Sequence, residues 1–280
     1  MLVKKQEPPD EVECAVTHVF SGHSPVEDAH VVPAEVSQDE LAALEWSWDL
    51  IRGTFDVNAR ENVIPVTAEL RSWFDLHEDS KPAGWLLLPA EYAREAIKAM
   101  YEQYVGEDFT ENEYRAKAVP GTRDWRQDPS TFYPDRTEFQ YRLVPLPSMS
   151  HCLSVRYYTG GPGPFKLDQL QLFVYPFGAF PTLTLRIPLH HAIVNSGQKL
   201  FALCGDAPLC LRTFSFLRAH ELVMLCVIRD IYLAWVRSYP SAGFRHGENT
   251  SLHHPHTPME DLGHQSFIHG TPSATAATAP

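Results

Sequence analysis

The chain has 280 residues and is 44% hydrophobic, so it is long enough for one large domain or two small ones with a real core. Its five cysteines are scattered and form no CxxC pair, which argues against a disulfide framework and a cysteine zinc ribbon. Residues 1–119 hold 10 Lys and Arg against 24 Asp and Glu, which disfavours tight, non-specific nucleic-acid binding by this half. The N-terminus lacks an apolar signal region and no apolar run could span a bilayer, so we expect an intracellular protein, cytoplasmic or nuclear and not secreted.

The first part of the chain predicts a hairpin followed by a helix. Residues 1–12 are polar and are expected to be a disordered lead. Strands are predicted over 13–20 and 26–33 with a turn between them, which places His30 on the second arm of a hairpin. A helix is predicted over 37–53, because Ser37 and Glu40 fit a capping box and Gly53 suits a helix C-terminus. This helix is interpreted as an insertion between two halves of a site.

The next stretch predicts a strand, a short helix and a second strand–helix pair. After a polar loop at 58–62, a brief strand covers 63–66 and Thr67 caps a helix that runs to about Asp75. A strand over 84–88 then precedes a helix that begins at residue 89 or 90 and ends near residue 104. Residues 105–135 are charged and poor in aliphatic side chains, which is typical of a linker or long loop.

The second half predicts a strand-rich region and one long helix. Strands are expected over 139–146, 167–175 and 183–189, the stretch 192–203 is ambiguous, and one helix is expected over 211–238. The fold class is therefore predicted to be α+β. We expect a disordered lead at 1–12, a module at 13–104 and a linker or long loop at 105–135. A strand-rich region with one long C-terminal helix then covers 136–240, and a disordered tail covers 241–280.

Five short motifs follow one another in the predicted module. In order they are Cys14-Ala15-Val16-Thr17, Ala29-His30-Val31-Val32-Pro33, Asn62, Leu70 with Phe74-Asp75, and Trp85-Leu86-Leu87-Leu88-Pro89. Together they resemble the HNH endonuclease family, which has a ββα-metal fold, in a form common in fungal proteins. The resemblance covers about residues 13–90, and a weaker echo lies at 190–200. In that pattern a histidine occupies the helix position where this chain has Arg71.

The resemblance implies metal-dependent hydrolysis of DNA phosphodiester bonds. His30 would be the general base, and Asn62 would pin the loop and orient the imidazole. A divalent ion, Mg²⁺ or Zn²⁺, would neutralise charge on the phosphate and the leaving oxygen. Arg71 has no lone pair for a metal, although it could contact a phosphate. A rearranged metal site would then use Asp75 or His77, with Asp28, two residues before His30, as a further candidate ligand.

Simpler roles for these residues remain open. Arg71 and Asp75 are four residues apart on one helix, so a salt bridge between them could replace the metal site. His30 could be a hydrogen-bonded structural histidine, and Asn62 could cap a turn. Two hypotheses therefore stand side by side: an HNH-type endonuclease, and a catalytically inactive HNH-fold binding or interaction protein.

Overall fold

The computed structural model describes residues 11–75, 84–106, 126–151, 154–161, 164–209, 212–238 and 240–245. Helices and strands alternate along these residues, so the predicted α+β class is confirmed. The strands are β1 (Val26–His30), β2 (Val63–Thr67), β3 (Trp85–Pro89), β4 (Phe139–Pro145), β5 (Ser154–Tyr158), β6 (Leu170–Val174) and β7 (Leu183–Leu185). The α-helices are α1 (Gln38–Ser47), α2 (Ala68–Phe74), α3 (Arg94–Tyr104), α5 (Leu189–Cys204), α6 (Ala219–Val236) and α7 (Ala242–Arg245). Short 3-10 helices cover Arg60–Asn62, Glu91–Ala93, Pro129–Phe132, Pro147–His151 and Leu167–Gln169.

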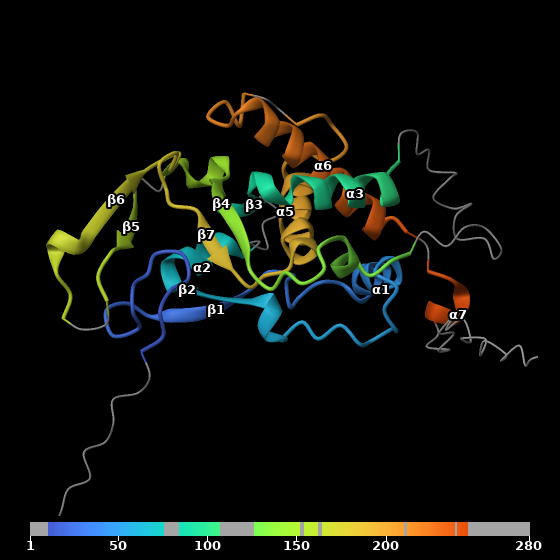
Figure 1. Cartoon of the computed structure of the whole chain (residues 1–280), viewed down its shortest axis with the longest axis horizontal. Helices are drawn as coiled ribbons and strands as arrows, with labels where there is room; N and C mark the ends of the chain where they lie inside the picture. The colour runs from blue at the N-terminus through green and yellow to red at the C-terminus, as the bar shows by residue number, and fades with distance from the viewer. Residues whose placement is uncertain are drawn as a thin grey trace, which may run out of the picture. The chain divides into compact units, whose positions relative to one another are not determined.

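The strands pair in three small antiparallel sheets (Figure 1). The pair β1–β2 aligns Ala29 with Ile64 and His30 with Val63, and α2 packs on both strands. The three-stranded sheet has the order β3–β4–β7, so β3 is an edge strand. The third sheet contains only β5 and β6.

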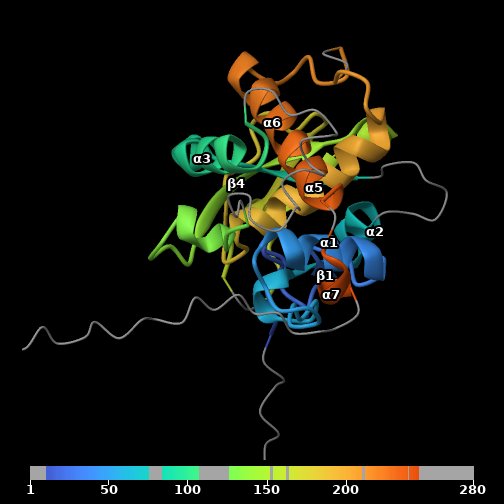
Figure 2. The same cartoon turned by 90° about the vertical axis from the view of Figure 1, so that its right-hand side faces the viewer.

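Helix α5 lies at the centre of the packing, between strand β3 and helix α6 (Figures 1 and 2). The approach to α6 depends on Gly197, because a Cβ atom there would lie 2.3 Å from Cβ of Tyr232. One continuous core of buried side chains extends from Cys14 to Phe244. The predicted module and the region that follows it therefore share this core through α5.

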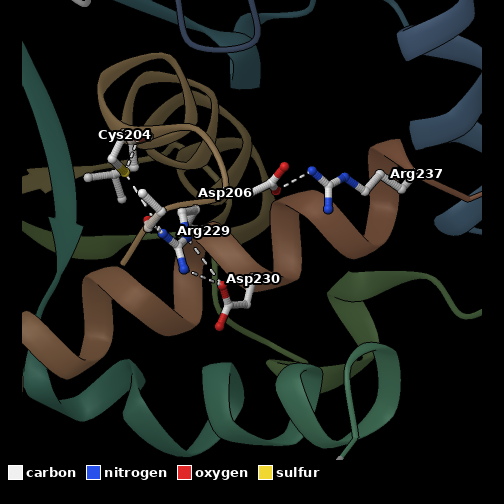
Figure 3. A network of polar contacts seen from close by, with 7 residues as sticks. Cys204, Asp206, Arg229, Asp230 and Arg237 are labelled. Atoms are coloured by element: carbon white, nitrogen blue, oxygen red, sulfur yellow. Dashed lines mark hydrogen bonds and ion pairs between the residues drawn. The ribbon is translucent and has the colours of Figure 1, made fainter. Parts of the chain in front are cut away.

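Polar contacts also fasten the end of α5 to α6 (Figure 3). The guanidinium of Arg229 donates to the carbonyl of Ala207 at 2.7 Å and to Oδ1 of Asp230 at 3.1 Å. Arg237, which directly follows the last residue of α6, pairs with Asp206 in the loop after α5. These two arginines fix the direction in which the chain leaves α5.

The predicted strand over 13–20 is wrong, because this stretch forms a tight turn with a single bridge between Glu13 and Phe20. The chain reverses so that the amide of Cys14 donates to the carbonyl of Val19 at 2.8 Å, with His18 at a positive φ of 56°. The partner of β1 is therefore β2, and the predicted pairing of 13–20 with 26–33 does not occur.

The turn is anchored by the sulfur of Cys14, which is fully buried. Its Sγ accepts from the backbone amides of Thr17 and Thr67, both at 3.3 Å. Since Thr67 ends β2 and immediately precedes α2, one thiol connects the turn to the start of that helix.

The predicted helix over 37–53 begins as expected but ends early, at Ser47. Ser37 caps its N-terminus, accepting from the amide of Glu40 at 3.1 Å. The helix ends because Asp49 adopts a positive φ of 55° and the next amide reaches back to the carbonyl of Glu45. The Glu45 carboxylate then accepts from the amides of Gly53 and Phe55 at 2.9 Å each, which folds the following loop back on the helix.

The predictions for β2, α2, β3 and the helix ending at residue 104 are confirmed, with small shifts of their ends.

In the second half, β5 was not predicted, and the expected strands over 167–175 and 183–189 shorten to β6 and β7. The ambiguous stretch 192–203 belongs to α5. The predicted helix over 211–238 is too long, because the Glu221 carboxylate accepts from the amide of Arg218 at 2.7 Å and begins α6 at Ala219. Helix α7 lies within the predicted disordered tail, while residues 1–10, 107–125 and 246–280 lie outside the described residues.

Candidate functional site

Asn62 is the best-anchored of the residues that the sequence singled out. Its side chain is fully buried, and Oδ1 accepts from the amide of Val32 at 2.8 Å. Its Nδ2 donates to the carbonyl of Val32 at 2.9 Å and to that of Val57 at 2.8 Å. The backbone carbonyl of Asn62 also accepts from Val31. Three of these four bonds tie the segment after β1 to the loop before β2, and the bond to Val57 closes that loop on itself, so Asn62 pins the two segments together.

His30 is half-buried at the end of β1, and its partner is Asn58. The distance from Nε2 to the side-chain Oδ1 of Asn58 is 3.1 Å. With that oxygen accepting, Nε2 carries the proton and Nδ1 presents its lone pair. Asn58 thus takes the orienting contact that the sequence assigned to Asn62. Asn58 stands in a polar loop that no motif distinguishes, which is why sequence reasoning missed it.

Arg71 lies in an ion-pair cluster with two carboxylates. Its guanidinium contacts Oε2 of Glu27 at 2.9 Å and Oδ2 of Asp75 at 3.4 Å. Partial burial disfavours its charge, but Glu27 and Asp75 outweigh this and raise the pKa of Arg71 above its ordinary value. We call Arg71, Glu27 and Asp75 the Arg71 cluster. The salt bridge between Arg71 and Asp75 that the sequence left open is present, together with a second one from β1.

The candidate residues fall on opposite faces of the β1–β2 pair. Side chains alternate along a strand, so Asp28 and His30 point away from the face that carries Glu27 and the buried Ala29. Because Arg71 pairs with Glu27, the Arg71 cluster lies on the face that α2 covers. The structure therefore brings Arg71 and Asp75 together but does not bring His30 to them.

Asp28 lies on the same face of the β1–β2 pair as His30, which we call the outer face, and lines a cavity there with Asn58. The cavity is open, has a volume of about 720 Å³ and is also lined by Arg60 and Arg186. Two arginines and two carboxylates, those of Asp28 and Glu61, line this outer cavity, so its charges are mixed. His77, the remaining predicted metal ligand, lies outside the described residues. Within the described ranges, no three His, Cys, Asp or Glu side chains come close enough to hold a metal ion.

Lys199 on α5 is a buried neighbour of the Arg71 cluster that sequence reasoning missed. Its Nζ donates to the carbonyl of Trp85 at 2.8 Å and lies 3.8 Å from the ring centroid of Phe74. Burial lowers the pKa of Lys199 well below its ordinary range, and the negative charge of Asp75 opposes part of this shift. A buried amine whose charge is disfavoured thus lies under the end of α2, next to the Arg71 cluster.

Lys199 belongs to a row of buried polar side chains on α5, which we call the α5 polar row. Each member donates to or contacts a backbone carbonyl of another element: His191 with Glu61 (3.3 Å), Asn195 with Val31 (2.8 Å), Ser196 with Leu87 (3.0 Å) and Lys199 with Trp85 (2.8 Å). Two of these carbonyls belong to β3 and two to the ends of the β1–β2 pair. The row therefore covers the open edge of β3 and joins it to the candidate site. Its signal in the sequence is the spacing of four between His191, Asn195 and Lys199, in a stretch that the sequence left ambiguous.

The N-terminal end of α5 carries two adjacent histidines in an aromatic environment. His190 pairs through Nδ1 with the hydroxyl of Tyr133, and its ring meets Trp48 edge-on at 4.8 Å. His191 stacks with Trp48 at 6.0 Å. Burial lowers the pKa of both rings, that of His191 to about 4, although its contact with the Glu61 carbonyl opposes the shift. Both imidazoles are therefore neutral at physiological pH.

Comparison with known proteins finds no relative of this chain. No protein-family model, no curated protein and no solved structure matches it. None of the helices in the described ranges combines the length and apolar character that a membrane span requires.

Proposed function

We propose that the β1–β2–α2 unit is a catalytically inactive HNH-like module, and that the protein works as a binding or interaction protein built on it. The Arg71 cluster carries this proposal. In the family that the sequence resembles, this helix position presents a metal-binding histidine. A guanidinium has no lone pair to offer a metal, and here it also engages the Asp75 carboxylate that would be the nearest alternative ligand.

The arrangement around the cluster supports the same proposal. General-base catalysis needs the base within hydrogen-bond reach of the water that attacks the phosphate, and that phosphate must also reach the metal. His30 points to the outer face of the strand pair, whereas Asp75 lies with Arg71 on the α2 side. One phosphate would have to contact both faces.

A metal-dependent endonuclease acting on DNA is the second candidate. The bond between His30 and Asn58 favours it, because this bond leaves Nδ1 of His30 free to accept a proton. Activity would then require Mg²⁺ or Zn²⁺ held by Asp75, His77 or Asp28, with Arg71 released from Asp75 to contact the phosphate. Arg60 in the outer cavity would supply a phosphate contact, although Asp28 and Glu61 line the same cavity and Arg186 is paired with Glu138.

A plasmid-nicking assay separates the two candidates. Wild-type protein is incubated with supercoiled plasmid and Mg²⁺, Mn²⁺ or Zn²⁺ near neutral pH, beside a His30→Ala variant. The inactive module predicts no nicking with any of the three ions. Nicking that disappears in His30→Ala would contradict the proposal and establish the endonuclease instead.

Arg71→His tests whether this position is where the metal chemistry is missing. The variant replaces a guanidinium with an imidazole that can bind Zn²⁺ beside Glu27 and Asp75. We expect it to bind Zn²⁺ at least tenfold more tightly than wild type in calorimetric titration. Arg94→His is the matched control, because Arg94, the first residue of α3, is equally exposed and pairs with Glu91 away from the cluster. Equal Zn²⁺ affinity of the two variants would contradict the HNH-like interpretation.

A further inference from the structure

A second cavity lies away from the Arg71 cluster and the outer face, between the turn at residues 14–24, the start of α2 and the β5–β6 pair. Its volume is about 370 Å³, within the range of pockets that hold small organic ligands. Its buried floor includes Thr17 and Val155, and its walls include His23, Trp73, Phe165 and Leu170. We call it the Thr17 cavity.

Two polar atoms at this cavity lack the partners that buried groups normally have. The Thr17 side chain is only 3% exposed, and neither its Oγ1 nor Nε2 of His23 has a hydrogen-bond partner among the described residues. Buried polar atoms are almost always hydrogen-bonded, because an unpaired one costs stability. Both orphaned atoms belong to residues that line the same cavity. A small molecule or an ordered water bound in the cavity would supply such a partner.

Both residues make defined contacts in the absence of a ligand. The amide of Thr17 donates to Sγ of Cys14, and its carbonyl accepts from the amide of Tyr158 at 2.8 Å. The His23 ring packs edge-on against Tyr158 and Phe165, with centroids 6.0 and 5.4 Å away. Because both atoms have almost no accessible surface, a ligand pairs with them only after the Thr17 side chain and the His23 ring turn toward the cavity.

The remaining lining defines the chemical class of the ligand. Trp73 and Phe165 present aromatic surface, and Val155 and Leu170 present aliphatic surface. Aromatic walls favour planar rings, which bury a large area and pack edge-on or offset against other rings. The charged lining groups, Glu69 and Arg156, are exposed and opposite in sign, so they select neither an anion nor a cation.

We propose that the Thr17 cavity binds a neutral aromatic molecule of one or two rings, whose hydroxyl, amide or ring nitrogen pairs with Oγ1 of Thr17 and Nε2 of His23. The site shares no residue with the Arg71 cluster, so it stands whether or not the β1–β2–α2 unit is catalytic. It assigns the protein a small-molecule binding activity in addition to the proposed module.

The test uses phenol, benzamide and indole as neutral probes, with benzoate and benzylamine as charged counterparts of similar size. Saturation-transfer NMR on the full chain detects binding at millimolar probe concentration, and titration gives the dissociation constants. At least one neutral probe is expected to bind, and benzamide is expected to bind more tightly than benzoate or benzylamine. Absence of binding by all three neutral probes, or tighter binding of a charged one, would overturn the proposal.

Three variants locate the binding. Thr17→Val keeps the shape of the side chain but removes the hydroxyl, so it should weaken the probe about tenfold, as expected for one lost buried hydrogen bond. Leu170→Trp should fill the cavity and abolish binding. Leu172→Trp is the matched control, because Leu172 lies on the same strand, is 60% exposed and does not line the cavity. It should bind like wild type.

The variants also keep the test decisive if folding is affected. Thr17→Val removes an unpaired hydroxyl, so its melting temperature in the absence of probe should equal or exceed that of wild type. Equal probe affinity in wild type, Thr17→Val and Leu170→Trp would overturn the site. A crystal structure grown with benzamide that shows only ordered water between Thr17 and His23 would overturn it as well.

Discussion

The Arg71 cluster and the α5 polar row both contact the β1–β2–α2 unit or its flanking residues, but they differ in how far solvent reaches them. The cluster is exposed, with its three side chains 41 to 48% accessible. The members of the row are 5% accessible or less, and each contacts a backbone carbonyl of another element. Exposed ion pairs contribute about 0–1 kcal/mol, whereas an unpaired buried polar group costs about 1–3 kcal/mol. The row should therefore contribute more to the free energy of unfolding than the cluster does. The cluster should matter mainly for whether a metal can bind.

Removing Lys199 from the row should lower the free energy of unfolding more than any other change proposed here. Lys199→Ala deletes a buried stem that packs on Phe74 and leaves the carbonyl of Trp85 without its donor. We expect the free energy of unfolding to fall by about 3 kcal/mol, from the combined cavity and unpaired-carbonyl terms. Chemical denaturation measures it. Lys98→Ala is the control, because Lys98 is 65% exposed on α3 and should change stability by less than about 0.5 kcal/mol. Equal effects of the two substitutions would contradict the importance of the row.

Acid should weaken the row next most strongly, through His191. Its pKa is about 4 in the folded protein because it is buried, against an ordinary value near 6.5. Between these values the unfolded chain binds a proton that the folded chain does not. The free energy of unfolding therefore falls as pH drops from about 6.5 to about 4, by about 3 kcal/mol, and this stability is complete above pH 6.5.

The variant His191→Gln isolates this contribution from that of the carboxylates. Glutamine can still donate to the carbonyl of Glu61 but does not titrate. The measurement is the difference between the stability–pH curves of wild type and variant. A constant difference from pH 4 to 7 would show that His191 is not a neutral buried group.

The Arg71 cluster should show the smallest effect on stability. Arg71→Gln removes two exposed ion pairs, and we expect the free energy of unfolding to fall by less than about 1 kcal/mol. The difference should shrink further in 1 M NaCl, because salt screens exposed charges. Denaturation at low and high salt measures it, and a loss above about 2 kcal/mol at both would place the cluster on the same footing as the row.

Local elements were predictable where one physical signal dominated. The apolar run of β3 and the amphipathic pattern of α3 each have a single interpretation, and both lie close to their predicted bounds. The turn after Cys14 was not predictable, because its alternating residues imitate a strand while a thiol and a positive φ at His18 reverse the chain. Helix α1 ended early for a similar reason, since Asp49 took the left-handed position that the sequence suggested for Gly53.

The candidate site was predictable in its residues more than in its geometry. The possible pairing of Arg71 with Asp75 followed from their spacing of four, but the second partner, Glu27, depends on the register of β1 with β2. The contact of His30 with Asn58 depends on how the loop before β2 folds. The α5 polar row was hidden because its partners are backbone carbonyls, which leave no trace in the identity of the residues that carry them.

The buried thiol of Cys14 gives the molecule an internal reporter of local opening. An alkylating reagent reaches this sulfur only when the turn and the start of α2 separate, since both amides that contact it belong to those segments. Cys204 and Cys226 are only partly buried, so their modification depends much less on such openings. We expect the rate of Cys14 modification to follow the population of the opened state while alkylation is slower than reclosing. Modification of Cys14 would thus report local opening between the turn and the start of α2, the junction that holds the candidate module together.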